Sequence, residues 1–386
     1  MKKICFVTGT RADYGIMRPV MRRIAASPDA ELQIVATNMH LSPDYGITIK
    51  EIEGDGFTVN AKVESLVAGG DEKATVKSMA KVQEGLAEVF TELKPDMVVI
   101  LGDRYEALAA ASAAVAFNIP VTHLHGGETT LGAIDDKFRH AITQLSDMHF
   151  ASTQEYADRI ISMGKDPITV FHSGAPGAEV KEVTSAEELN KTAADFYEKT
   201  GIRGYEPFIL MAYHPVTLLD DKGKNELNEI IKALDKFINQ GYRVLVTMPN
   251  SDPGTKEITE VLQQWGDRNK GMVILVKSLG AKLFRFAMET ALAIVGNSSA
   301  ALIEAPSFRL GAVNVGIRQK GRTHGLTVID APADAQRIEK ALDTVMSMEM
   351  KAFLLGMPVA ALNPYYKEDA ADFIARKILN CNVNNE

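Results

Sequence analysis

Carboxylate side chains in the first half of the chain stand where they could exchange protons with a bound molecule. Asp103 and Glu128 each follow a short apolar run, 97–101 and 121–124, that is typical of a buried β-strand. We expect these strands to be neighbours, so that the two carboxylates lie close together. Proximity and desolvation raise the proton affinity of one carboxylate relative to the other. The same residue type can then provide both a general acid and a general base.

Two further candidates for proton chemistry have an ordinary structural explanation as well. Asp135 opens the segment "DDKFRH", which indicates a helix start, and Arg139 lies four residues later on the same helical face. From the spacing alone, this pair is equally well a solvated ion pair. His214 ends another strand-like run, 208–213, where it could donate to a phosphate, protonate a leaving oxygen or simply cap its loop.

Arginines at the ends of strand-like segments predict an anionic ligand. The stretch "TGTRADYG" at 8–15 puts Arg11 and Asp13 at the turn from the first strand into the first helix, and Arg104 and Arg318 follow later strands. Guanidinium groups bind phosphate oxygens in planar, bidentate geometry. Any one charged loop residue is more often a cap or a surface charge. The prediction therefore depends on the recurrence of polar residues after seven strand-like segments.

The segment "GNSSAALIEAP" combines a tight turn with a predicted helix over 300–308. Ser298 or Ser299 caps this helix, and its free N–H groups and dipole attract an anion. For the serines alone, capping is a sufficient explanation. Glu304 adds a carboxylate one turn into the helix, where it can accept hydrogen bonds from a ribose diol. Together with the arginines, this segment indicates a nucleoside diphosphate ligand.

Strand-like and helix-like segments alternate along the chain, which predicts an α/β fold of βαβ units with parallel sheets. The expected strands are 3–8, 32–37, 97–101, 121–124, 148–151, 168–172, 208–213, 243–247, 272–276, 292–295 and 312–315. The expected helices are 17–26, 76–94, 105–117, 136–145, 154–163, 224–240, 281–289, 300–308, 334–350 and 368–379.

Two series of strands predict two doubly wound domains. We expect an N-terminal domain over 1–175, a linker region over 176–204 and a C-terminal domain over 205–365, with a helix in 366–386 packing back on the first domain. Ligands of such sheets bind at the carboxyl ends of the strands, in the crevice between the domains. Most of the polar residues described above follow strands and therefore belong to that edge.

Composition and missing motifs exclude several classes of protein. The chain has 386 residues and a formal net charge of −8, which disfavours nucleic acid as a partner and leaves room for a small anion. The chain has two cysteines, too few for a disulfide framework. We recognise no signal peptide and no apolar run of bilayer length. These features predict a cytoplasmic protein without a membrane partner. Neither G-x-G-x-x-G nor G-x-x-x-x-G-K-[ST] occurs, which argues against NAD-linked redox chemistry and a P-loop enzyme.

The motifs taken together resemble one family, the hydrolysing UDP-N-acetylglucosamine 2-epimerases of sialic acid biosynthesis. The resemblance runs from residue 2 to about residue 325 through "TGTRADYG", "LGDRYE", "HLHGGE", "IDDKFRHAIT", "HPVT", "PNSDPG", "GNSSAALIE" and "GIRQKGR", with a weaker tail at "NPYYKEDAA". It implies a GT-B-like fold, with two Rossmann-like doubly wound domains and the nucleotide-sugar in an interdomain cleft. It also implies a homodimer or homotetramer that needs neither a redox cofactor nor a metal.

The resemblance implies a reaction in two steps. UDP leaves C1 as a proton leaves C2, and water then adds to the resulting 2-acetamidoglucal with inverted C2, which releases free N-acetylmannosamine. Carried over motif by motif, the acid and base set is Asp103, Glu128 and Asp135, with Arg139 supporting Asp135 and His214 at the diphosphate. Phosphates are held by Arg11, Arg104, Ser298, Ser299 and Arg318, Glu304 takes the ribose, and Asp13, Asn250, Asp252 and Leu279 also contact the nucleotide or substrate.

Differences from the motifs of related enzymes favour one branch of the family but leave the sugar and two rival functions open. Non-hydrolysing 2-epimerases carry "TGQH" where residues 37–40 read "TNMH", and "HLHGGETT" lacks their "EAGLR" element, so the hydrolysing branch is favoured. Relatives in legionaminic acid pathways take UDP-2,4-diacetamido-2,4,6-trideoxyglucose or a GDP-linked sugar with much the same signature. A GT-B glycosyltransferase and a non-catalytic regulator that binds a nucleotide-sugar remain as rivals, the first needing an acceptor site and the second no proton chemistry.

Overall fold

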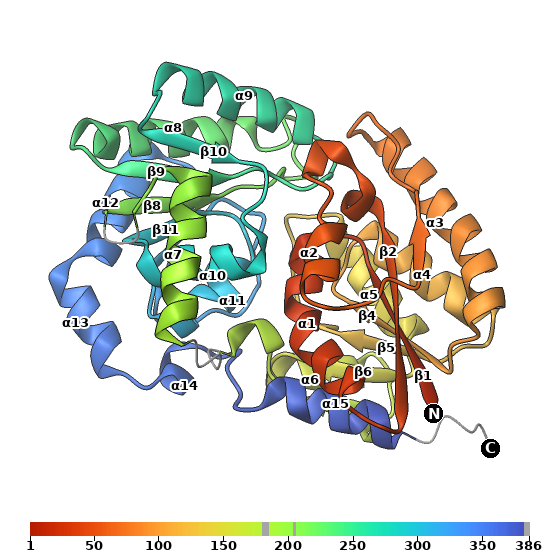
Figure 1. The fold of residues 1–386 in the computed structure, drawn as a ribbon. Helices are drawn as coiled ribbons and strands as arrows, with labels where there is room; N and C mark the ends of the chain where they lie inside the picture. Colours follow the sequence, from red (N-terminus) through yellow and green to blue (C-terminus); the bar gives the residue numbers. More distant parts are fainter. Residues whose placement is uncertain (180–184, 204–205, 382–386) are drawn as a thin grey trace. The chain divides into compact units, whose positions relative to one another are not determined.

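The computed structural model describes residues 1–179, 185–203 and 206–381. The chain divides into two compact units (Figure 1). Unit 1 comprises residues 1–128, 134–179 and 367–386, and unit 2 comprises residues 129–133 and 180–366. Residues 180–184 and 204 of the expected linker, residue 205 of the expected C-terminal domain and residues 382–386 of the expected C-terminal stretch lie outside the described residues.

Unit 1 is built on a seven-stranded sheet whose neighbouring strands are all parallel. In spatial order the strands are β3 (Ala61–Val63), β2 (Ala30–Thr37), β1 (Lys2–Thr8), β4 (Met97–Leu101), β5 (Val121–Leu124), β6 (Met148–Ala151) and β7 (Val170–His172). The chain reverses its direction of winding between β1 and β4. Ligands of open α/β sheets bind at the carboxyl ends of strands at such a switch point.

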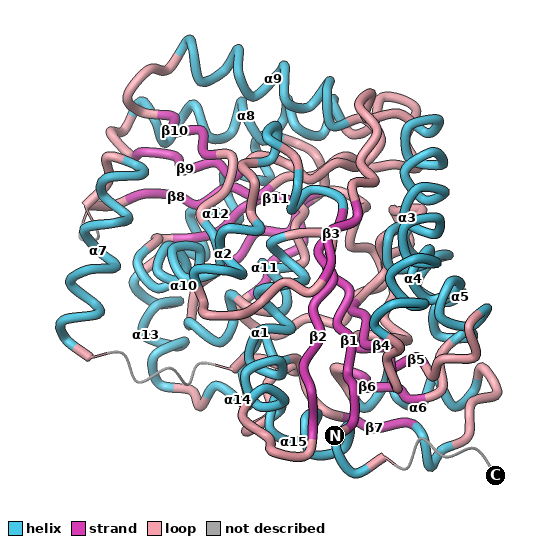
Figure 2. The backbone as a smooth tube through the Cα atoms, turned by 45° about the vertical axis from the view of Figure 1, so that its right-hand side comes forward, coloured by secondary structure: helices cyan, strands magenta, loops and turns pink. Residues whose placement is uncertain are grey.

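Helices cover both faces of this sheet (Figure 2). Ile4 and Phe6 of β1 pack under α1 (Arg11–Ala25), α2 (Ile49–Gly54) and α15 (Ala370–Asn380), and Cys5 and Val7 pack under α3 (Glu72–Leu93), α4 (Tyr105–Ala116) and α5 (Asp135–Leu145). Successive side chains of a strand point to opposite faces, so one apolar run supplies both cores. α6 (Gln154–Ser162) follows β6 in the chain and contacts β6 and β7. The C-terminal helix α15 packs against α1.

Unit 2 has a six-stranded sheet, again with every neighbouring pair parallel. The order is β10 (Val273–Val276), β9 (Arg243–Thr247), β8 (Phe208–Ala212), β11 (Ala293–Gly296), β12 (Ala312–Val315) and β13 (Val328–Ala331), with the switch point between β8 and β11. One face packs under α8 (Lys224–Asn239), α9 (Thr255–Arg268) and α12 (Ala335–Met346), and the other under α7 (Ala186–Thr200), α10 (Gly280–Thr290) and α11 (Ala300–Ile303). The chain continues through α13 (Met348–Gly356) and α14 (Val359–Leu362).

All strands expected from the sequence are present, with ends shifted by at most two residues. The expected helix over 17–26 is wrong at its start, because Thr10 and Asp13 form a capping box that begins α1 at Arg11. The expected helix over 300–308 is also wrong. It is the four-residue α11 followed by a 3-10 turn over 305–308, and Pro306 explains the break because it removes a donor and disfavours a helical residue before it.

Several elements escaped the sequence analysis. β3 is a three-residue edge strand, too short to show a pattern. α9 is rich in polar residues, and its buried face consists of Ile258, Leu262 and Trp265. The expected linker contains α7, whose Phe196 is completely buried in the core of unit 2. These segments depend on a small number of large apolar side chains that only the folded core identifies.

Candidate active site

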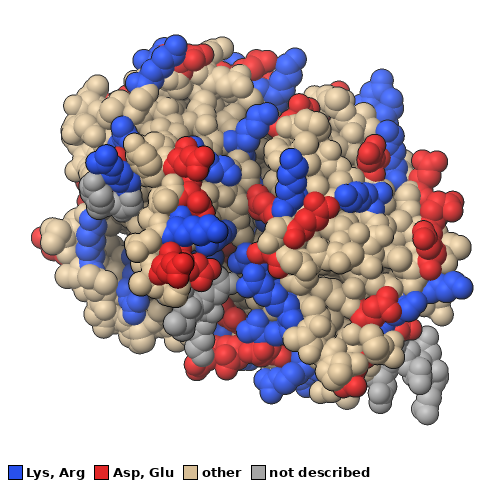
Figure 3. Space-filling model, in the orientation of Figure 1, with Lys and Arg blue, Asp and Glu red and all other residues tan. Residues whose placement is uncertain are grey.

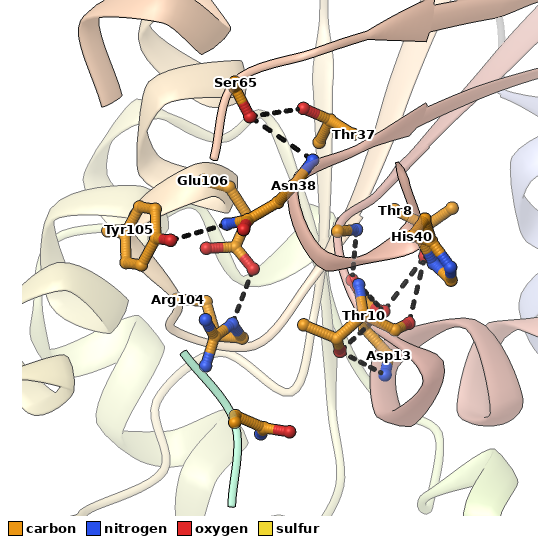
Figure 4. Close-up of polar contacts among 12 residues, drawn as sticks. Thr8, Thr10, Asp13, Thr37, Asn38, His40, Ser65, Arg104, Tyr105 and Glu106 are labelled. Carbon is orange, nitrogen blue, oxygen red and sulfur yellow. Dashed lines mark hydrogen bonds and ion pairs between the residues drawn. The ribbon is translucent and has the colours of Figure 1, made fainter. Parts of the chain in front are cut away.

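The turn from β1 into α1 is held together by Asp13 (Figure 4). Its carboxylate accepts hydrogen bonds from the N–H of Gly9 and of Thr10, both at 2.9 Å, and from the Thr8 hydroxyl at 2.9 Å. Thr10 caps the helix in return, with its hydroxyl accepting from the N–H of Asp13. Both carboxylate oxygens of Asp13 thus serve the turn that presents Arg11, the first residue of α1.

A buried histidine in the 3-10 turn after β2, Asn38–Leu41, supports the same turn. The His40 ring contacts the Thr8 hydroxyl through Nε2 at 3.0 Å and the Thr48 hydroxyl through Nδ1 at 2.8 Å. Burial lowers the pKa of His40, although the charge of Asp13 opposes this. Burial also lowers the pKa of Arg11 to about 10, so its guanidinium stays charged at neutral pH.

Arg104, which precedes α4, is held by a carboxylate that the sequence analysis missed. Its Nε donates to Oε1 of Glu106 at 2.5 Å, and its guanidinium lies 5.4 Å from the centre of the Tyr105 ring (Figure 4). Burial raises the pKa of Glu106, while the charge of Arg104 lowers it. A Cβ atom added to Gly9 would lie 2.6 Å from Cγ of Glu106, so this side chain also closes on the β1–α1 turn. An acidic residue two positions after the arginine of "GDRYE" was the available signal.

Asp103 follows β4 and forms an ion pair with the buried Arg139 of α5. Arg139 also lies 3.9 Å from a carboxylate oxygen of Asp136. Helical spacing relates Arg139 to Asp135, one residue before Asp136, and gives no indication of the contact with Asp103. Because Arg139 is almost completely buried, its guanidinium fixes the position of the Asp103 carboxylate at the end of β4.

The main chain beside Asp103 is held by His123 of β5. Nε2 of this completely buried ring lies 2.7 Å from the carbonyl oxygen of Gly102. Burial lowers the pKa of His123 to about 4, so the ring is neutral at neutral pH. A carbonyl oxygen can only accept, so Nε2 carries the proton.

Glu128 is completely buried beyond the end of β5. Oε1 accepts a hydrogen bond from the Ser152 hydroxyl at 2.6 Å and lies 2.8 Å from Nδ1 of His125. The expected adjacency of β4 and β5 is confirmed, so Asp103 and Glu128 do follow neighbouring strands. Ser152 follows β6 and was missed, because its relation to Glu128 depends on the sheet order rather than on sequence distance.

In unit 2, Asn297 holds His214 after β8. Its Oδ1 accepts from the N–H of His214 at 2.7 Å, and its Nδ2 donates to the carbonyl of His214 at 2.8 Å. The N–H of Asn250 donates to Nδ1 of the His214 ring at 3.4 Å. A neutral ring whose Nδ1 accepts carries its proton on Nε2, so Nε2 is a donor. In the sequence, Asn297 is recognisable only as part of a turn.

Arg318 contacts the same turn, with Nη1 donating to the Asn297 carbonyl at 3.1 Å. The Ser298 hydroxyl accepts from the N–H of Ala300 at 3.4 Å, whereas Ser299, which directly precedes α11, makes no side-chain capping hydrogen bond. The dipole argument for an anion at this helix is not supported, because α11 has only four residues and few aligned peptides. Glu304 stands at the carboxyl end of α11 rather than one turn into a longer helix.

The remaining predicted nucleotide contacts lie on the turns after β9 and β10. Asp252 is buried, and its carbonyl accepts from the N–H of Thr255 at 3.0 Å where α9 begins. Leu279 is buried directly before α10. In each unit the predicted site residues therefore gather at the carboxyl edge of the unit's own sheet.

Other features of the described residues bear on binding. Among residues 1–179, 185–203 and 206–381, no group of three or more His, Cys, Asp or Glu side chains could hold a metal ion. None of the described helices combines the length and apolar character needed to cross a bilayer. Basic and acidic side chains are interspersed over the face shown in Figure 3.

Comparisons with known proteins identify relatives over almost the whole chain. The family model described as UDP-N-acetylglucosamine 2-epimerase matches residues 22–379. The GDP/UDP-N,N'-diacetylbacillosamine 2-epimerase (hydrolyzing) of Campylobacter jejuni is 36% identical over 91% of this chain and 89% of its own length. The UDP-N,N'-diacetylbacillosamine 2-epimerase (hydrolyzing) of Legionella pneumophila is 39% identical over 86% of this chain and 85% of its own length.

A solved structure supports the fold. The UDP-GlcNAc 2-epimerase from Neisseria meningitidis bound to UDP-GlcNAc superimposes with a TM-score of 0.79 over 98% of this chain and 100% of that chain, at 17% identity. The expected fold class, GT-B-like with two Rossmann-like domains, is confirmed. The family match and the two relatives show that this chain is an enzyme of the UDP-N-acetylglucosamine 2-epimerase family, in its hydrolysing branch.

Proposed function

We propose that the enzyme converts a UDP-linked 2-acetamido sugar into UDP and the free 2-epimeric sugar. A proton leaves C2 as the C1–oxygen bond breaks, which gives UDP and a 2-acetamidoglucal. Water then adds across the double bond, with hydroxyl to C1 and a proton to the opposite face of C2. The observation that carries the proposal is the pair of anchored carboxylates after β4 and β5, Asp103 on Arg139 and Glu128 between Ser152 and His125.

The sugar we propose is a 2,4-diacetamido-2,4,6-trideoxyhexose, with UDP-N-acetylglucosamine as the second candidate. The first is favoured because two relatives named for UDP-N,N'-diacetylbacillosamine share 36% and 39% identity with this chain. The second is favoured by the description of the matching family model. For either sugar the product is a precursor of sialic acid or a related nonulosonic acid.

We assign roles to the individual residues from the family resemblance, supported by the contacts within each unit. Proton transfer is assigned to Asp103, Glu128 and Asp135, with Arg139 orienting Asp103 rather than serving Asp135 alone. Asp13 orients Arg11 through the turn that it holds and need not contact the substrate. The nucleotide and its phosphates are assigned to Arg11, Arg104, His214, Asn250, Asp252, Leu279, Ser298, Ser299, Glu304 and Arg318. We also propose a cytoplasmic homodimer or homotetramer, which sedimentation of the purified chain would test.

Incubation in D2O without any acceptor tests the reaction. The substrates are UDP-N,N'-diacetylbacillosamine, UDP-N-acetylglucosamine and a GDP-linked counterpart, and mass spectrometry resolves the products. We expect UDP and a free sugar that carries one deuterium at C2, with the diacetamido substrate turned over fastest. No turnover without an acceptor would indicate a glycosyltransferase. A product without deuterium at C2 would exclude proton exchange there.

Asp103→Asn tests the assignment of the base and acid set. The substitution removes the ionisable group and keeps its size, so we expect kcat to fall by about 10²-fold or more while the Kd for UDP stays within about threefold. Asp29→Asn, at an exposed position beyond the amino end of β2, is the matched control. Full activity in Asp103→Asn would overturn the assignment, and a parallel loss of UDP binding would indicate a binding function instead.

A further inference from the structure

A buried asparagine connects three segments that carry proposed diphosphate contacts. Asn297 lies in the turn after β11, and its side chain is completely buried. β11 pairs with β8, with Gly296 opposite Ala212, and the two strands lie side by side in Figure 1. The N–H of Asn297 donates to the carbonyl of Ala212 at 3.2 Å. Asn297 is thereby placed beside the residues that follow β8.

The carboxamide of Asn297 continues the pairing of the two strands beyond their ends. It forms reciprocal hydrogen bonds with the main chain of His214, at 2.7 Å from the N–H to Oδ1 and at 2.8 Å from Nδ2 to the carbonyl. An N–H only donates and a carbonyl only accepts, so the orientation of the carboxamide is determined. The main chain of His214 cannot move away without breaking both bonds.

The main-chain carbonyl of Asn297 holds a second segment. It accepts from Nη1 of Arg318 at 3.1 Å and from Nε2 of Gln319 at 2.8 Å. Gln319 is buried, so its contact anchors the segment that carries Arg318. One residue thus fixes the positions of His214 and Arg318, and it directly precedes Ser298.

We propose that Asn297 is a positioning residue, which holds His214, Arg318 and the Ser298 turn in the one arrangement that receives a diphosphate. This rests on the proposed function, since the diphosphate belongs to its substrate. Asn297 itself need not touch the ligand. If Asn297 served only the stability of unit 2, its replacement would weaken the binding of uridine and of UDP alike.

Asn297→Asp is the sharpest perturbation, because its effect depends on pH. The carboxylate keeps an acceptor for the His214 N–H but turns a second oxygen toward the His214 carbonyl. The protonated acid is nearly isosteric with the carboxamide, and its hydroxyl can donate to that carbonyl. Burial raises the pKa of a carboxyl group, so protonation restores the contact at mildly acidic pH.

The experiment is calorimetry of UDP and uridine binding to the full chain between about pH 5.5 and about pH 8. Relative to the wild type at each pH, we expect Asn297→Asp to raise the Kd for UDP by about tenfold or more at the upper pH, and by less than about threefold at the lower pH. The Kd for uridine stays unchanged. Asn314→Asp is the matched control, because Asn314 is buried in the same unit and bonds to Asp330 instead.

Each outcome decides the proposal. An equal loss for UDP and uridine, a loss independent of pH, or an equal loss in Asn314→Asp would overturn it. If Asn297→Asp does not fold, Asn297→Ser is used, whose hydroxyl is too short to reach both groups of His214. If the wild type does not bind UDP, the proposed function fails, and the inference is judged by hydrogen exchange of the His214 amide, which donates to Asn297. We expect faster exchange in Asn297→Asp than in Asn314→Asp, and an unchanged rate would refute the positioning role.

Discussion

Gly296→Ala tests the close approach of the β11 main chain to β8 in unit 2. Gly296 ends β11 with φ at +136°, and an added Cβ would lie 2.1 Å from the carbonyl oxygen of Ala212 on the paired strand. An ordinary carbon–oxygen contact is about 3.3 Å, so the turn must move by about 1.2 Å. The obstacle is main chain in the middle of a sheet, which has no alternative rotamer.

The expected destabilisation has two sources. A positive φ costs an alanine about 1–3 kcal/mol, and overpacking against a rigid neighbour costs about 1–3 kcal/mol more. Gly241→Ala separates the two, because Gly241 has φ at +93° and no heavy atom lies within 4 Å of its added Cβ. Gly296→Ala should therefore be less stable than Gly241→Ala by about 1–3 kcal/mol.

Urea unfolding monitored by tryptophan fluorescence measures this difference within unit 2. Trp265 is the single tryptophan of the chain and is completely buried in the core of that unit. With a slope of about 3 kcal/mol per molar urea, the midpoint of Gly296→Ala should lie about 0.3–1 M below that of Gly241→Ala. The displaced turn should also raise the Kd for UDP by about tenfold or more. Equal midpoints for the two variants would refute the reasoning from the close contact.

Two further predictions concern one proposed catalytic carboxylate and one ion pair. Ser152→Ala removes a hydrogen bond to the buried Glu128 that is worth about 1.5–3 kcal/mol. We therefore expect kcat to fall about 10–100-fold with an unchanged Kd for UDP. Unchanged steady-state kinetics would show that Glu128 does not depend on this hydrogen bond. The hydrogen bond between the His324 ring and the Asp330 carboxylate raises the pKa of His324 and lowers that of Asp330. The stability from the pair is therefore lost as pH rises through the raised pKa of His324 and as pH falls through the lowered pKa of Asp330. In the wild type, the urea midpoint should be highest between the pKa of Asp330 and the pKa of His324. The same pH dependence in Asp330→Asn would show that it does not come from this pair.

Much of the architecture could be predicted from local patterns. Buried parallel strands are continuous apolar runs bounded by polar turns, which is why 97–101, 121–124 and 243–247 were identified with their observed bounds. Polar residues after those runs necessarily belong to the carboxyl edge of a sheet. The candidate site in each unit was therefore visible in the sequence as a list of residues, without their mutual contacts.

Local patterns failed where a side chain or segment is defined by a distant partner. Helical spacing relates Arg139 only to Asp135, and it gives no indication of the ion pair with Asp103, which joins two elements. The helix expected over 300–308 stops after four residues, so its dipole gives little support to the predicted anion site. Ser152 carries no signature of its own, because its importance comes from Glu128, which the folded sheet brings beside it.

Local sequence patterns are sufficient to predict the two parallel sheets, the edge of each that carries the polar residues, and the resemblance to the family. Which carboxylate each guanidinium and hydroxyl contacts, and the connection of His214 to Arg318 through Asn297, become visible in the folded chain. This difference arises from the separation in sequence of the residues that interact. Strand and helix patterns follow from neighbours a few residues apart, whereas a hydrogen bond is set to within tenths of an ångström by the order in which strands pair.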